Sequence, residues 1–148
     1  GSVVTWGNDF AGGNNLAVRD QLKGVQQIQA TTHAFAAILG DGSVVTWGHA
    51  GLGGNSSAVR DQLKGVQQIQ ATGQAFAAIL RDGSVVTWGN DFAGGNNLAV
   101  RDQLKGVQQI QATSQAFAAI LGDGSVVTWG SAEAGGDGSA VQDQLKGV

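Results

Sequence analysis

Apolar and polar positions recur along the chain with a constant period. The string Gly-Ser-Val-Val-Thr-Trp-Gly begins at Gly1, Gly42, Gly83 and Gly124, which gives a repeat of 41 residues. Self-similarity at such a fixed step is typical of repeat proteins. We therefore expect one repeat domain over residues 1–148, with repeats that start at residues 1, 42, 83 and 124 and a last repeat that is incomplete.

Three segments of each repeat have the pattern of β-strands. In the copy that runs from Val25 to Gly65, residues 25–31 alternate weakly, residues 34–39 are apolar throughout, and residues 43–47 have high β propensity. An Asp-Gly pair at Asp41 and Gly42 separates the last two segments, and this pair favours a tight hairpin because glycine accepts a positive φ. Each repeat should contain a three-stranded antiparallel meander.

The segment at residues 57–65 favours a short helix between repeats. It begins with a serine that can cap a helix, and Gly65 stands where helices commonly stop. A fourth, outer strand is the alternative, because Val59 and Leu63 are too few apolar residues to fix the period.

A sheet that is apolar on both faces needs neighbours on both sides, and identical units at a fixed step supply them. The sequence therefore predicts an all-β protein with short helices between repeats, either a β-propeller or an open propeller-like array, with a β-solenoid as the alternative. In the propeller, the repeated tryptophans act as structural wedges between successive blades: Trp6, Trp47, Trp88 and Trp129.

The copies of the three strand segments are unequal in number. The third segment occurs four times, but the pair of first and second segments occurs three times. Propellers close with about four blades or more, and an incomplete blade exposes an unpaired strand edge. We therefore expect part of a longer array or a protomer whose ends pair with another copy, and we favour a homo-oligomer.

Composition narrows the classes of partner. The net charge is −3, and the eight Lys and Arg residues are spread over the repeats, so there is no basic stripe for nucleic acid. No stretch approaches the ~18 consecutive apolar residues of a membrane helix, so we expect no membrane partner. The absence of cysteine excludes disulfide and thiolate chemistry and indicates no compartment.

The residues of catalytic type do not form a recognisable set. His33 and His49 are the two histidines of the chain, and neither recurs in the other repeats. Aspartates recur at Asp41, Asp82 and Asp123, but each precedes a glycine in a predicted turn, which explains its presence. We expect no catalytic residue, no metal site and no cofactor, and therefore no enzyme.

Differences between the copies are concentrated in two segments. One follows each Trp-Gly pair, and the other joins the first and second strands. Because direction reverses at each strand of a meander, both segments should lie at one end of the sheets. Loops at one end of a rigid scaffold commonly carry recognition, although loops also simply tolerate change. The candidate binding residues on this face are Asn8, Asp9, Phe10, His33, His49, Leu52, Asp91, Phe92 and Glu133.

The segment 33–48 reads His-Ala-Phe-Ala-Ala-Ile-Leu-Gly-Asp-Gly-Ser-Val-Val-Thr-Trp-Gly and resembles the repeat of the RCC1 superfamily, including HERC-type propellers. That repeat has a His-led apolar strand, an Asp-Gly or Asn-Gly turn and a strand that ends in Trp-Gly. The resemblance implies an RCC1-like β-propeller fold. The family's Gly-Gln-Leu-Gly loop is replaced by Ala-Gly-Gly-Asn at residues 11–14, and Gln74 and Gln115 stand in place of the leading His33.

We expect a non-enzymatic repeat scaffold for protein binding or self-assembly. Residues 1–41 and 83–123 differ only at Thr32 against Ser114 and His33 against Gln115, which indicates recent amplification or design. A designed or consensus repeat without natural function is therefore one alternative. The RCC1 resemblance gives a second, a regulator of the guanine-nucleotide-exchange type, although no motif identifies exchange residues.

Overall fold

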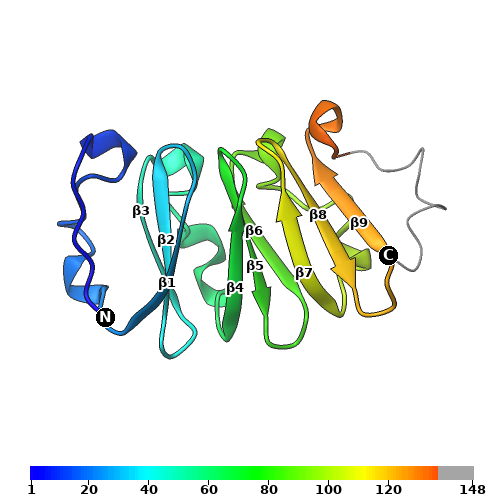
Figure 1. The fold of residues 1–148 in the computed structure, drawn as a ribbon, viewed down its shortest axis with the longest axis horizontal. Coiled ribbons are helices and arrows are strands. Elements are labelled where there is room, and N and C mark those ends of the chain that lie inside the picture. The colour runs from blue at the N-terminus through cyan, green and yellow to red at the C-terminus, as the bar shows by residue number, and fades with distance from the viewer. Residues whose placement is uncertain (137–148) are drawn as a thin grey trace.

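The computed structural model describes residues 1–136 and contains three antiparallel sheets, which stand side by side in a row (Figure 1). We call each sheet a blade. The strands of the three blades are, in chain order, β1 (Val25–Ala30), β2 (Ala34–Leu39) and β3 (Val44–Gly48); β4 (Val66–Ala71), β5 (Ala75–Leu80) and β6 (Val85–Gly89); and β7 (Val107–Ala112), β8 (Ala116–Leu121) and β9 (Val126–Gly130). The predicted three-stranded meander is confirmed in each blade.

The strand register follows from the Asp-Gly turn. Asp41 and Gly42 reverse the chain between β2 and β3, Gly42 has a φ of +83°, and its N–H donates to the carbonyl of Leu39 at 2.9 Å. This turn places Phe35 opposite Trp47 on the paired strands. The central strand β2 is the all-apolar segment, as expected of a strand covered on both faces.

Short 3₁₀ helices connect the strands. One group of helices follows the Trp-Gly pairs: η1 (Asp9–Ala11), η3 (Ala50–Leu52), η5 (Asp91–Ala93) and η7 (Ala132–Ala134). A second group precedes the blades: η2 (Arg19–Gln21), η4 (Ser57–Gln62) and η6 (Arg101–Gln103). The preference for a helix at residues 57–65 was right in kind, and the alternative of a fourth strand was wrong. The helix is of the tighter 3₁₀ type and ends before Leu63, whose side chain is buried between blades.

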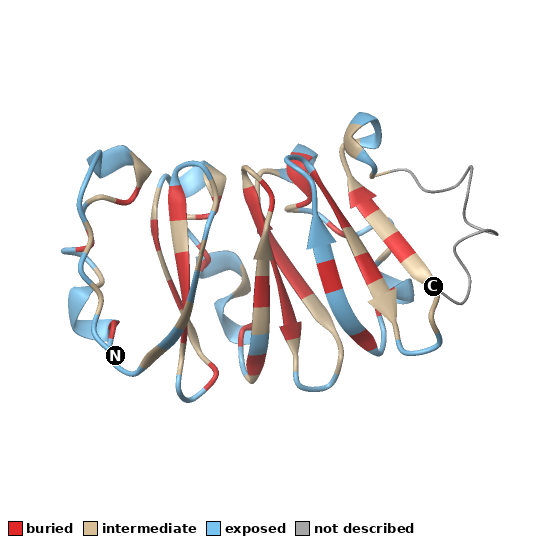
Figure 2. Cartoon of the chain, viewed as in Figure 1, coloured by how far each residue is buried: buried red, intermediate tan, exposed pale blue. Residues whose placement is uncertain are grey.

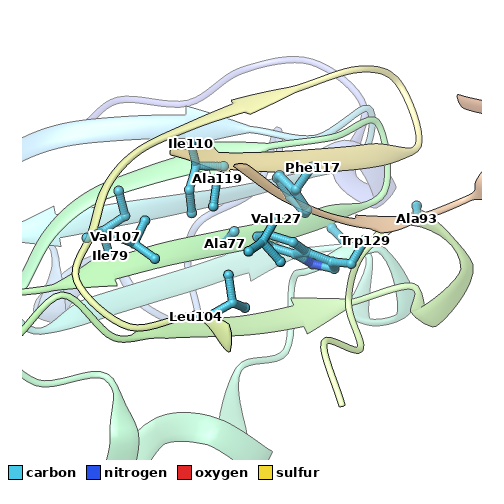
Figure 3. Packing of buried hydrophobic residues seen from close by; sticks show 11 residues of the cluster. Ala77, Ile79, Ala93, Leu104, Val107, Ile110, Phe117, Ala119, Val127 and Trp129 are labelled. Carbon is cyan, nitrogen blue, oxygen red and sulfur yellow. The ribbon is translucent and has the colours of Figure 1, made fainter. Parts of the chain in front are cut away.

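Each blade is apolar on two faces that meet different neighbours. The face towards the preceding repeat, which we call the leading face, carries Phe76 and Ala78 of β5, and the trailing face carries Ala75, Ala77 and Ile79. Trailing and leading faces of successive blades pack into one core, as Figure 3 shows for Ala77 and Ile79 against the third blade. Successive blades therefore share their hydrophobic cores.

Three tryptophans tie each blade to the loop of the repeat before it. The indole Nε1 atoms of Trp47, Trp88 and Trp129 donate to the carbonyl oxygens of Gly12, Gly53 and Gly94, each at 3.1 Å. Each indole ring also lies with its centroid 5.3 Å from the ring of the paired phenylalanine on the central strand. The three side chains are buried, so that each joins the core of its blade and satisfies its one polar group.

The first tryptophan is different, and the expected core role is not met for Trp6. Its side chain is 84% exposed, and Val4 is 78% exposed. Residues 2–6 have the same sequence as the third strands, yet they form no strand, because no first and second strands lie beside them to pair with. The third strand therefore forms three times, not four, among residues 1–136.

The three blades form an open array rather than a closed ring (Figure 1). The middle blade has a neighbour on each side, and its central strand β5 carries the most continuous burial (Figure 2). The two outer blades have one blade neighbour each. Burial in this fold thus depends on the position of a blade in the row.

We expect Trp88→Ala to lower the free energy of unfolding by about 3–5 kcal/mol, because it opens a cavity between blades and leaves the Gly53 carbonyl without its donor. Trp6→Ala is the matched control, since it alters the same sequence string at an exposed site and should change stability by less than about 0.5 kcal/mol. Chemical denaturation of the monomeric species measures both. Equal losses for the two variants would contradict the assignment of Trp88 to the core.

Candidate protein-binding edge

The two variable segments of each repeat lie together at one edge of the array. The N–H of His49, just after β3, donates to the carbonyl of His33 in the β1–β2 turn at 2.7 Å, and the next two blades repeat this bond from Asn90 to Gln74 and from Ser131 to Gln115. This edge carries η1, η3, η5 and η7 and lies at the top of Figure 1. We call it the loop edge: residues 8–12, 31–33, 49–53, 72–74, 90–94, 113–115 and 131–135.

The glycine that ends each third strand permits this close approach. Gly89 has a φ of +112°, and a Cβ atom added there would lie 2.7 Å from the Cα atom of Ala75. A side chain at this position would meet both backbone strain and a steric clash. The invariant glycine therefore brings the exit of the third strand against the turn between the first two.

An invariant threonine holds each of the loops after β3, β6 and β9 to the turn of its own blade. The hydroxyl of Thr31 donates to the carbonyl of Leu52 at 2.8 Å, and Thr72 and Thr113 repeat this bond to the carbonyls of Ala93 and Ala134. Sequence reasoning missed this role. The signal that could have found it is that the threonine stays constant at the start of a turn whose next two residues vary.

Successive turns are also linked to one another along the edge. The backbone N–H and the hydroxyl of Thr32 both reach the carbonyl of Gly73 at 2.9 Å, and the N–H of Gly73 donates to the carbonyl of Ser114 at 2.8 Å. These bonds join neighbouring blades. The loop edge is therefore one continuous, backbone-bonded row.

Exposed phenylalanines stand on asparagine-capped turns at this edge. The Asn8 and Asn90 side chains accept hydrogen bonds from the N–H groups of Phe10 and Phe92 at 2.8 and 2.9 Å. Such Asx turns fix the backbone two residues after the asparagine. Phe92 is 85% exposed, and Phe10 is nearly as open. Large apolar side chains are thus presented to solvent from ordered turns.

Two exposed leucines share this arrangement and were missed as candidates. The side chains of Asn14 and Asn96 accept from the N–H groups of Leu16 and Leu98, both at 2.9 Å, and both leucines are largely exposed. The signal lay in the variable string Asn-Asn-Leu, which becomes Asn-Ser-Ser in the second loop. The loops that display a phenylalanine also display a leucine.

The loop after β3 presents different groups on the same frame. The ring Nδ1 of His49 accepts from the N–H of Gly51 at 3.1 Å, in the place where Asn8 and Asn90 cap the loops that display phenylalanine. The rings of His33 and His49 meet edge to face, with centroids 6.3 Å apart, and Leu52 is half-buried. Within residues 1–136, no three His, Asp or Glu side chains gather in a way that could hold a metal ion.

The charges of the loop edge are acidic. Asp9, Asp91 and Glu133 each lie in the first turn of a 3₁₀ helix and are exposed, and none of the loop-edge residues is Lys or Arg. The variable residues of the fourth loop beyond residue 136 lie outside the described residues. The candidate residues named from the sequence are thus brought together along one acidic, aromatic edge.

The opposite edge carries the Asp-Gly turns. The hydroxyl of Ser84 donates to Asp82 at 2.6 Å and its N–H donates at 2.9 Å, and the turns at Asp41 and Asp123 repeat both bonds. These hydrogen bonds, the one from the serine hydroxyl foremost, lower the pKa of each carboxyl below its ordinary value. The three aspartates act as turn residues, as expected from the sequence.

Comparison with solved structures identifies the fold. No family model and no curated protein matches the sequence. Yeast RCC1 (Prp20) matches with a TM-score of 0.52 and 18% identity in its complex with Kap60, and with a TM-score of 0.53 and 17% identity in the structure of Prp20p from Saccharomyces cerevisiae. The CRINKLY WD40 ectodomain of the receptor kinase ACR4 from Arabidopsis thaliana matches with a TM-score of 0.50 and 24% identity.

The likeness to these proteins concerns the fold and part of their length. Each match covers 72% of this chain, but only 29%, 30% and 38% of the three structures. The chain therefore has an RCC1-like β-propeller repeat fold and spans about a third of such proteins. In the part of the chain that the structure describes, no helix is long and apolar enough to cross a membrane.

The Asp-Gly turns give a pH-dependent contribution to stability. Because the carboxyl pKa is lower in the folded state, the contribution is fully present above the unfolded pKa of about 4 and is lost as pH falls through the folded pKa. The triple variant Asp41→Asn, Asp82→Asn, Asp123→Asn should melt below the wild type at pH 7. The difference should close as pH falls below about 4, as thermal melts will show; a constant difference would contradict the role of these carboxylates.

Proposed function

We propose that this chain is a non-enzymatic scaffold that binds a protein partner through the loop edge and associates with copies of itself through the ends of the array. The observation that carries the first part is the display of Phe10 and Phe92 from asparagine-capped turns, with the loop of Phe92 anchored by Thr72 to the backbone-bonded row of turns. Rigid loops that present aromatic side chains are favourable for binding, because little conformational entropy is lost there.

The division between frame and display supports this proposal. In the loops after β3 and β6, a side-chain cap, a threonine anchor and the Trp-Gly pair form the frame, while the residue displayed at the tip changes from Gly51 to Phe92. The first loop keeps the asparagine cap and displays Phe10, and the loop after β9 keeps the threonine anchor and displays Glu133. A frame that holds while its tips vary is what recognition by loops requires. Tolerance of change alone would not require ordered turns beneath the variable residues.

The chemistry of the edge indicates the kind of partner. The exposed phenylalanines need an apolar surface to cover them, and the aspartate next to each favours basic groups at its rim. We therefore propose a partner with an apolar pocket or groove bordered by Lys or Arg. The protein-binding propellers among the structural neighbours are consistent with a scaffold role, since Prp20p binds Gsp1p and histones.

The ends of the array support the second part. Within residues 1–136, the leading face of the first blade and the trailing face of the third blade have no blade against them. Propeller-like sheets with uncovered faces and edges tend to acquire a partner. We propose homo-oligomerisation as the way in which this chain covers them.

Phe92→Ala should leave the melting temperature nearly unchanged, because the side chain is exposed, and should weaken binding of a partner by about 1–3 kcal/mol. The partner can be sought by selecting peptides from a displayed random library on the immobilised wild-type chain. Affinities of the selected peptides for the two proteins, measured by calorimetry, give the effect. We expect the selected peptides to be rich in apolar and basic residues.

Two further variants test whether the exposed leucine of the same loop takes part in binding. Leu98→Ser installs the residue that the second loop carries as Ser57, so it should fold normally and also weaken binding. Ala99→Ser alters an exposed neighbour outside the loop edge and should leave binding unchanged. Peptides that bind all of these proteins equally would place the binding surface elsewhere.

A further inference from the structure

The N-terminal end of the array contains an apolar groove of about 210 Å³ between residues 3–6 and the leading face of the first blade. Exposed Val4 and Trp6 form one wall, and Ile28, Phe35 and Trp47 lie on the blade side. The groove lies at the end of the row where the N-terminal segment runs beside the first blade (Figure 1).

The next repeats show what belongs in such a groove. One repeat later, the equivalents of these residues include Val45, Trp47, Ile69 and Phe76, and the central strand β2 runs between them, paired with β3 and packed on β4. The same arrangement recurs with β5 one repeat further on. The groove has the lining of a site for a central strand.

The exposure of one isoleucine distinguishes the open groove at the first blade from the filled sites at the second and third blades. Ile69 and Ile110 are 0% exposed because the trailing-face residues of the preceding blade cover them. Their equivalent Ile28 is 39% exposed. A trailing face placed in the groove would cover it in the same way.

A matching trailing face, without a blade against it among residues 1–136, lies on the third blade. It carries Ala118 and Ile120 of β8, which are half-buried, whereas their equivalents Ala77 and Ile79 are buried against the third blade. These residues are identical to those that cover Ile69 and Ile110 within the chain. The groove at one end and the trailing face at the other are therefore complementary, because the chain already makes the same contact between its first and second blades and between its second and third blades.

Resting on the self-association proposed above, we propose that the groove receives β8 of a second copy as its central strand. Residues 2–6 then pair along β8 of that copy in the register of β9, with Trp6 in the place of Trp129 opposite Phe117. The sequence from Gly1 to Gly7 is identical to that from Gly124 to Gly130, so the exchange conserves the strand contacts. The net gain is the apolar surface covered between the two blades.

In the proposed contact, residues 2–6 of one copy pair with β8 of the second copy in place of that copy's own β9. The segment that follows residues 2–6 favours this exchange. The carbonyl of Gly12 accepts the indole bond of Trp47, and Leu22 is buried against the first blade. This segment stays on the first blade and holds residues 2–6 beside the groove. β9 of the second copy therefore leaves its place on β8 when residues 2–6 enter.

The contact is head to tail. Its two faces lie at opposite ends of the row (Figure 1), so each chain offers one groove and one trailing face. A contact of this kind joins different surfaces of identical chains and generates a closed ring or an open series. Two chains of three blades supply six, within the range of about four to eight blades of typical propellers, so we expect a ring of two copies.

Complementary single variants test this contact. Ile28→Glu places a charge in the groove and Ala118→Glu places one on the trailing face, so each should raise the dissociation constant for self-association by about tenfold or more. Ala99→Glu adds the same charge outside both faces and is the control. Mass measured by sedimentation and light scattering, with melting temperatures to establish folding, gives the outcome.

A mixture of the two variants gives the decisive result. The Ala118→Glu chain keeps an intact groove and the Ile28→Glu chain keeps an intact trailing face, so the mixture should form a 1:1 dimer through one contact. A monomeric wild type at micromolar concentration would overturn the proposed self-association and this contact together. A wild type that assembles while Ile28→Glu assembles equally well, or a mixture that stays monomeric, would overturn this contact alone.

Tryptophan fluorescence tests the strand exchange itself. Trp6 is exposed and Trp129 is buried, and the exchange would reverse the two. In the Trp129→Phe chain, assembly should therefore lower the acrylamide quenching constant as Trp6 becomes buried. In the Trp6→Phe chain, assembly should raise it as Trp129 leaves its blade. Assembly that changes the quenching of neither variant would exclude the exchange.

Discussion

The structure depends on one constraint, that each sheet is apolar on both faces and must be covered by copies of itself. The central strands are rich in alanine, so neighbouring blades approach closely, and the larger leucine and tryptophan side chains fill the space between them. The indole bond from each of the three buried tryptophans to the loop of the preceding repeat adds a directional link. Stability is therefore a property of neighbouring pairs of repeats, and a blade at either end has less of it.

The structure within a single repeat could be predicted from local sequence. The three strands, the Asp-Gly hairpin and the crowding of the variable segments at one edge follow from strand patterning and reversal of direction, and the structure has them. Burial of the same residue in different repeats depends instead on which strands lie beside it. Trp6 and Trp88 stand in the same seven-residue string, yet one is exposed and the other buried, because only the second has a first and second strand beside it. No local pattern distinguishes the two.

The loop edge shows the same limit in finer detail. Comparison of repeats located the variable residues, but it overlooked Thr72, which is constant, and Leu98, whose exposure depends on the Asx turn at Asn96. A side chain that anchors a loop is invisible to a search for differences. From sequence alone a leucine is expected to be buried in the core. Its exposure depends on the tertiary structure and becomes evident only when the backbone around it is known.

Assembly and recognition would be coupled in this molecule through the strand that is exchanged. If residues 2–6 replace β9 on a neighbouring copy, the loop that follows them is the one bearing Phe10, and it takes the place of the loop bearing Glu133. The joint between copies then displays an aromatic residue where the isolated chain displays an acidic one. Because the head-to-tail contact repeats the geometry within the chain, the loop edges of successive copies would face the same way. Several weak contacts on one partner could then act together, with avidity set by the spacing of the repeats.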